Sequence, residues 1–241
     1  MQLSVLYDVT RQMAILMLIT SMGLISQNGY AAEAKKSENT ANTTSPAKHK
    51  SFIANDEFSL HSSALRDLML TLYQCNPHEL QKSTKVSKEE FVQWVFEGPF
   101  GWKFDAIRNK QTLDALSLSL NPEYQADRVL PLVTGLYTMI LNSYGGETEY
   151  RFTQPINPNI LLTASQNVDI SAIKLLNIKR DNGEAYIADN CKLAVKQSLN
   201  DISQHISRNA QNIAKETKQA INFNTHNLMQ IENKNHEFIQ F

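Results

Sequence analysis

The sequence predicts a mainly α-helical protein, a single orthogonal or irregular bundle of five to seven helices with at most a two-stranded β-ribbon. Three observations support this fold class. Apolar residues recur every three or four positions through most of the chain. Several of these stretches begin with a residue pattern typical of helix starts. Alternation with a period of two is confined to short stretches, which leaves little material for a sheet.

The N-terminal segment has the pattern of a secretory signal peptide, which we place at residues 1–31. Arg11 precedes an uncharged apolar run, residues 13–25, and small residues follow it. At about 1.5 Å per residue this run spans roughly 20 Å, too short for a hydrocarbon core of roughly 30 Å. We therefore expect cleavage after Ala31, or alternatively after Ala34, and export to the periplasm or the medium. The mature protein should contain no transmembrane helix.

Composition divides the remaining residues into three parts. Residues 32–57 are rich in Ala, Lys, Ser, Asn and Thr and are expected to form a disordered linker. Residues 58–218 carry the helical periodicity and should form one domain, which is a normal size for a single core. Residues 219–241 are rich in Asn and lose the regular apolar face, so we expect a flexible C-terminal tail.

The first helices of the domain are predicted by periodicity and by capping residues. A helix over residues 63–74 would place five apolar side chains on one face: Leu65, Leu68, Met69, Leu72 and Tyr73. Ser87 and Glu90 form a capping box that opens the next helix. Gly98 and Pro99 should end that helix.

Asparagine-proline pairs occur three times, at Asn76-Pro77, Asn121-Pro122 and Asn157-Pro158. Asn is a strong N-cap, and Pro is best tolerated in the first helical turn. Each pair is therefore predicted to open a helix.

The second half of the domain contains the predicted core helix. Residues 129–144 include no charged side chain and are apolar on all sides, which is typical of the central helix of a bundle. A helix follows Asn157, and the last helix, from about Asn190, has an apolar seam interrupted by Asn209. Residues 150–152 and 185–188 are the two candidate strands of a ribbon.

Two cysteines, Cys75 and Cys191, are the only ones in the chain. In an exported protein such a pair favours a disulfide. The alternative is two buried, unpaired thiols that behave as small apolar groups. Both alternatives stay open, and neither cysteine has the sequence context of a nucleophile.

Charge and motif content exclude some function classes. The chain has 23 Lys and Arg against 24 Asp and Glu, a net charge of −1, so it lacks the basic character of a nucleic-acid-binding protein. The histidines are scattered without metal-ligand spacing, and we expect neither a metal nor another cofactor. Ser171 and Lys174 have the spacing of a serine–lysine pair, but the accompanying motifs of penicillin-binding proteins are missing, and we interpret them as a solvated helix face.

Two groups of residues are candidates for a site. Glu147 and Glu149 follow a double glycine and are the best placed carboxylates for acid–base chemistry. Phe100, Trp102 and Phe104 lie in a predicted turn, where they would stack on sugars, insert at a membrane surface or anchor a protein partner. The alternative for these aromatics is a cluster packed over the core.

The resulting functional hypothesis is a non-enzymatic binding or scaffold module of the cell envelope, whose partner is an envelope protein or a cell-wall component. The alternative is a hydrolase or transferase that acts on the cell wall or another exported polymer, with its site near Glu147. Many catalytic sites have no local sequence signature, so the missing motifs weigh only modestly against an enzyme.

Overall fold

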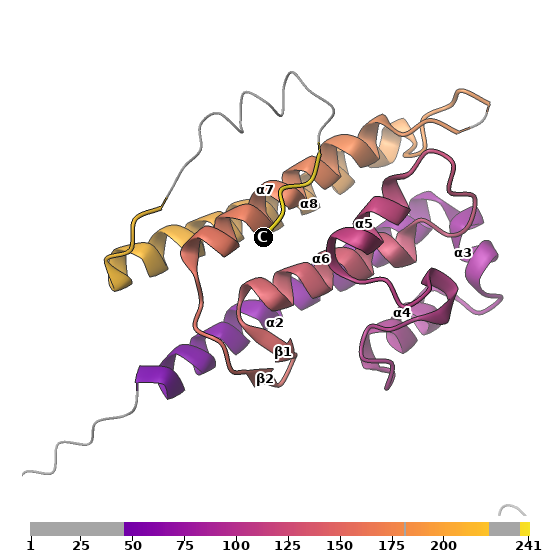
Figure 1. Cartoon of the computed structure of the whole chain (residues 1–241). Helices are drawn as coiled ribbons and strands as arrows, with labels where there is room; N and C mark the ends of the chain where they lie inside the picture. The colour runs from indigo at the N-terminus through magenta and orange to yellow at the C-terminus, as the bar shows by residue number, and fades with distance from the viewer. Residues whose placement is uncertain (1–45, 181, 222–236) are drawn as a thin grey trace, which may run out of the picture. The chain divides into compact units, whose positions relative to one another are not determined.

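The computed structural model describes residues 46–180, 182–221 and 237–241, which contain seven α-helices, one 3₁₀ turn (η1) and a two-stranded antiparallel ribbon (Figure 1). The predicted helical bundle with a minor ribbon is confirmed. In chain order the elements are α2 (Pro46–Cys75), α3 (Pro77–Ser83), α4 (Lys88–Glu97), η1 (Asp105–Ile107), α5 (Thr112–Leu120), α6 (Val129–Ser143), β1 (Gly146–Thr148), β2 (Arg151–Phe152), α7 (Pro158–Asn177) and α8 (Asp189–Thr217).

The predicted signal peptide and its two cleavage positions lie outside the described residues, as does the first part of the predicted linker. Among the residues that the structure does describe, no helix combines the length and the hydrophobicity needed to cross a bilayer.

The core is organised around α6, as its uncharged sequence predicts. Every residue of this helix except Asn142 is buried. Helices α2, α5 and α7 and strand β1 all contact it. A helix enclosed on all sides needs apolar residues on all sides, and this explains the absence of charge from residue 129 onward.

Helix α2 is longer than predicted. It begins at Pro46 instead of residue 63, so it includes the end of the segment that composition assigns to a disordered linker. Ala54 and Phe58, one turn apart, are both buried in the core. The Phe58 ring meets the Tyr137 ring edge-on, with centroids 5.0 Å apart. Two apolar residues were too few to create a periodic signal, but they are enough to dock a helix on a core that already exists.

Two asparagine-proline pairs open helices as predicted, Asn76-Pro77 for α3 and Asn157-Pro158 for α7. The prediction for Asn121-Pro122 is wrong, because this pair lies in the loop between α5 and α6. The cause is the buried Arg128, whose guanidinium donates hydrogen bonds of 2.6 to 2.9 Å to three carbonyl oxygens of the loop region, those of Ser119, Asn121 and Pro122. Carbonyls aimed at one side chain cannot also form a helical ladder.

The ribbon pairs β1 with β2. The predicted strand at residues 185–188 is not part of it, since Ala185 forms only an isolated bridge with Lys179. A turn of two residues, Glu149 and Tyr150, joins the two strands. The neighbouring segment is therefore the cheaper partner, because a short loop costs less closure entropy than a long one.

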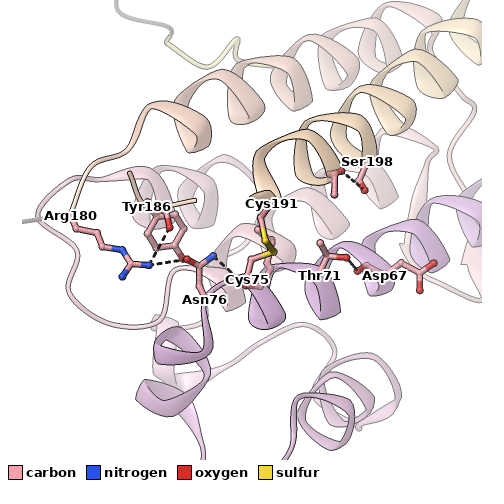
Figure 2. The surroundings of a disulfide bond; sticks show 10 residues. Asp67, Thr71, Cys75, Asn76, Arg180, Tyr186, Cys191 and Ser198 are labelled. Atoms are coloured by element: carbon pink, nitrogen blue, oxygen red, sulfur yellow. Dashed lines mark hydrogen bonds between the residues drawn. A yellow bond between two sulfur atoms is a disulfide. The ribbon is translucent and has the colours of Figure 1, made fainter. Parts of the chain in front are cut away.

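A disulfide joins Cys75, the last residue of α2, to Cys191 in the first turn of α8 (Figure 2). The two Cα atoms are 6.1 Å apart and 116 positions apart in sequence. Beside it, Arg180 donates to the side-chain oxygen of Asn76 at 3.0 Å and to the backbone oxygen of Tyr186 at 3.3 Å. Of the two states that the sequence left open for the cysteines, the structure therefore contains the disulfide.

A partly buried hydrogen-bond chain links α2, the residue that follows α6, and α8. The Nδ2 of Asn209 donates to Tyr144 Oη and to Glu57 Oε2, at 2.7 Å each. Tyr144 Oη in turn lies 3.0 Å from Nε2 of His61, and this pattern assigns Nε2 as the acceptor of a neutral imidazole. Burial, together with the nearby His205, lowers the pKa of His61 to about 3.

We expect the double variant Cys75→Ala/Cys191→Ala to fold and to lose about 3–5 kcal/mol of unfolding free energy, because the crosslink restricts a long loop in the unfolded chain. Chemical denaturation of the oxidised protein and of the variant measures this difference. A reductant should lower the midpoint of the native chain and leave that of the variant unchanged. Two free thiols in the mass spectrum of the oxidised protein would contradict the disulfide.

Acid should destabilise the fold through His61. Its pKa is about 3 in the folded chain against 6.5 in the unfolded one, so the unfolded state binds more protons between these values. The contribution of His61 to the free energy of unfolding is therefore fully present above pH 6.5. It falls as the pH is lowered, by about 2–3 kcal/mol at about pH 4.5. Urea denaturation of His61→Gln across this range should show a flatter pH dependence than that of the native protein. The exposed His78→Gln is the control, and an equally steep curve for both variants would rule out His61 as the cause.

Candidate functional site

A pocket of about 370 Å³ lies between the end of α4, the loop that follows it, α6 and the ribbon. The two groups of candidate residues from the sequence meet here, since Glu147, Glu149 and Trp102 all line this pocket. Its aromatic lining is completed by Phe96, Tyr137 and Tyr150. A hollow of this size is at the small end of the range typical of ligand sites.

Trp102 reaches the pocket from a strained backbone. Its φ is 60°, in the left-handed region that non-glycine residues rarely adopt, and the preceding Gly101 has φ of 57°. The indole stacks on the ring of Tyr137, with centroids 3.6 Å apart and planes 19° apart, and Phe96 meets it edge-on at 5.0 Å. These contacts offset the backbone strain and leave Trp102 only 9% exposed.

The strain continues through the same loop. Arg108, Asn109 and Thr112 also have positive φ, between 47° and 55°. For Thr112, a β-branched residue, this conformation is a genuine outlier, and it is held by a 2.7 Å hydrogen bond from its backbone N–H to Thr138 Oγ1. Backbone strain of this kind is concentrated at functional sites in proteins. Residues 101–112 are therefore shaped by neighbouring side chains of α6, Tyr137 and Thr138.

Glu149 is held beside two tyrosines. Its Oε2 accepts a 3.0 Å hydrogen bond from the hydroxyl of Tyr137. Burial and the negative charge of Glu149 raise the pKa of Tyr137, so this hydroxyl keeps its proton and remains a donor. The pKa of the exposed Tyr150 is also raised, chiefly by hydrogen bonding to Glu149. The carboxylate thus faces the pocket as an oriented hydrogen-bond acceptor.

Glu147 has a different environment. Its side chain is 47% exposed, and Oε2 lies 3.3 Å from Nε of Arg151. The other oxygen accepts a 2.7 Å hydrogen bond from Thr153 Oγ1. A general acid needs an apolar surrounding, and Glu147 is instead half-exposed beside a guanidinium and a hydroxyl.

The charge of the pocket is negative. Its lining includes two acidic residues, Glu147 and Glu149, and no Lys, Arg or His. Such a pocket attracts hydroxyl, amide and ammonium donors and repels anions. Within the described part of the chain no group of three His, Cys, Asp or Glu residues is arranged to hold a metal ion.

The aromatic turn does not present one continuous surface. Phe100 is 45% exposed and Phe104 is half-buried against the core, and both line a second hollow of about 280 Å³ together with Trp94. The ring centroids of Phe100 and Phe104 are 5.5 Å apart. Trp102 instead belongs to the pocket with the glutamates, so the three residues of the predicted surface are divided between two hollows.

The serine–lysine pair is not assembled for catalysis. Ser171 is fully buried, and its hydroxyl donates to the backbone oxygen of Asn167 at 2.8 Å. Nζ of Lys174 lies 5.0 Å from the ring centroid of Phe238. The hydroxyl therefore serves the helix backbone, and the ammonium packs over an aromatic ring.

Sequence reasoning missed Tyr137 as a site residue, because the uncharged run around it indicates core. A phenol in a run of aliphatic residues is the signal that could have found it, since a buried tyrosine hydroxyl needs a hydrogen-bond partner. Here that partner is Glu149.

Comparisons with protein-family models, with curated proteins and with solved structures found no match to this chain. A helical bundle by itself does not imply a function, because the same architecture serves many activities. The chemistry of the pocket is therefore what carries the functional argument.

Proposed function

We propose that this protein is an exported, non-enzymatic binding module of the cell envelope, and that its pocket holds a hydroxyl-bearing segment of a cell-wall glycan. The observation that carries the proposal is the placement of the Glu149 carboxylate next to the Trp102–Tyr137 stack in a pocket lined by no cation. A carboxylate accepts strong hydrogen bonds from sugar hydroxyls, and aromatic rings pack against the apolar faces of a sugar. The strained loop that presents Trp102 supports the same assignment.

Two features support an extracytoplasmic location. The apolar run at residues 13–25, with Arg11 before it and small residues after it, has the pattern of a signal peptide. The disulfide between Cys75 and Cys191 is of a kind that persists outside the reducing cytosol.

A hydrolase or transferase with a carboxylate site near Glu147 is the second candidate. It is favoured by the presence of two glutamates in one pocket, as glycosidases commonly use a pair of carboxyl groups. The half-exposed position of Glu147, beside Arg151 and Thr153, weighs against a general acid at this residue. The binding function therefore agrees better with the geometry.

Export should remove the first residues of the chain. When the full chain is produced in a bacterial host, we expect the recovered protein to begin at Ala32, or at Lys35 if cleavage follows Ala34. Intact mass and N-terminal sequencing decide between these ends. Ala31→Leu should block cleavage after residue 31, because the peptidase requires a small residue there. An intact Met1 on the exported protein would contradict the signal peptide.

Glycan binding can be followed through the fluorescence of Trp102 in a Trp94→Phe background, where it is the only tryptophan. We expect a saturable change on titration with the tetrasaccharide of N-acetylglucosamine. Glu149→Gln should weaken this binding at least about tenfold, since it removes the charge from a hydrogen-bonded acceptor. The exposed Glu184→Gln is the matched control and should bind as the parent does.

Insoluble cell wall provides the second arm of this test. The protein should co-sediment with purified wall and leave no soluble fragments in the supernatant. Release of fragments that depends on Glu147 would favour the hydrolase instead. Equal binding by Glu149→Gln and its parent would remove this pocket from the function.

A further inference from the structure

The C-terminal end of the chain is hydrogen-bonded to α7 through the side chain of Asn167. Nδ2 of Asn167 donates to the backbone oxygen of Ile239 at 2.9 Å, and Oδ1 of Asn167 accepts from the backbone N–H of Ile239 at 2.8 Å. The end of the chain lies along α7 in Figure 1. Part of the segment predicted as a flexible tail therefore has a defined position.

This pair of hydrogen bonds recognises a polypeptide backbone. The backbone N–H of Ile239 donates to the amide oxygen of Asn167, and the backbone C=O of Ile239 accepts from the amide nitrogen. A residue pairs with a neighbouring β-strand through the same two backbone groups. The bonds themselves do not depend on the side chain at that position. Asn167 is 0% exposed, so its amide would lose both of these partners if the tail moved away, at the cost of a buried unsatisfied group.

Side chains beside Ile239 add selectivity. Phe238 packs against the core, and Nζ of Lys174 lies 5.0 Å from the centroid of its ring. Ile239 itself is half-buried, whereas Gln240 and Phe241 are exposed. The recognised unit is thus an aromatic residue followed by a branched aliphatic one, and both hydrogen bonds of Asn167 go to the backbone of Ile239.

The occupant is tethered to the site and not built into it. Residues 237–241 belong to no helix or strand. They belong to the same chain as α7, which makes their binding an intramolecular event. A segment held in this way can exchange with a free peptide of the same chemistry.

We propose that Asn167 and the surface of α7 around it form a peptide-binding site for a segment with an aromatic residue followed by a branched aliphatic one, and that the chain's own C-terminus is its resident occupant. A polypeptide partner that presents this unit competes with the tail. The site is separate from the pocket at Glu149, so its test is independent of the proposed glycan binding.

The test uses the complete chain with its tail displaced. Ile239→Pro removes the backbone N–H that Asn167 accepts. A fluorescein-labelled peptide of sequence Glu-Phe-Ile-Gln-Phe should then bind at least about tenfold more tightly to this variant than to the native protein, where the tail competes. Fluorescence anisotropy measures both affinities, and circular dichroism checks that the helices are intact.

Dependence on the amide is tested in the same background. Asn167→Asp keeps the shape of the side chain and loses its donor, so it should weaken the peptide at least about tenfold, whereas Asn177→Asp, at an exposed position of the same helix, should not. A peptide N-methylated at Ile removes the other hydrogen bond of the pair, from the Ile backbone N–H to Asn167 Oδ1, and covers the case in which the Asp variant does not fold. Absence of binding to Ile239→Pro, or equal binding of the methylated peptide, would overturn the proposal.

Discussion

The structure depends on the burial of α6, in which every residue except Asn142 is buried. An uncharged helix enclosed on all sides requires that the charged groups at its entrance be satisfied without water. Asp127 meets this need, because its carboxylate accepts hydrogen bonds from the hydroxyls of Tyr73 and Ser83 and from the backbone N–H of Val129, at 2.6 to 2.8 Å. Burial nevertheless raises the pKa of Asp127. The guanidinium of the neighbouring Arg128 binds carbonyl oxygens of the preceding loop region. Asp127 and Arg128 together therefore satisfy the polar groups at the start of α6 and determine the conformation of the loop before it.

The candidate site inherits its rigidity from this helix. Tyr137 and Thr138 are buried residues of α6, and they hold two strained positions, Trp102 in the loop and Thr112 at the start of α5. Left-handed backbone at non-glycine residues persists only where the surroundings determine it more strongly than the local preference does. A closely packed helix provides such surroundings, because its side chains have little freedom to follow the loop as it relaxes. The pocket is thereby preorganised, which reduces the ordering cost of binding a ligand.

Local signals predicted the helices well, and long-range contacts account for what they missed. The periodicity of α6 and α7 and the cap at Ser87 depend on neighbours within two turns, which the sequence displays directly. The Asn121-Pro122 pair was mispredicted because Arg128 competes for its carbonyls. Both groups of site residues were found individually, but the meeting of Trp102 with Glu147 and Glu149 in one pocket depends on tertiary packing of segments that are distant in sequence. The positive φ of Trp102 has no sequence signature.

Two asparagines, the buried Asn167 and the partly buried Asn209, illustrate how an interruption in an apolar pattern should be interpreted. Asn209 interrupts the seam of α8, and Asn167 stands among buried residues of α7; each donates its amide to a distant segment. The bonds have similar lengths, but their partners differ in freedom. Tyr144 and Glu57 adjoin or belong to helices packed in the bundle, so separating them from Asn209 requires the bundle to open. Ile239 lies in a segment, residues 237–241, that belongs to no helix or strand. Replacing the partner of Asn167 therefore requires only that one short segment lose its contacts, whereas replacing the partners of Asn209 requires the bundle to unfold.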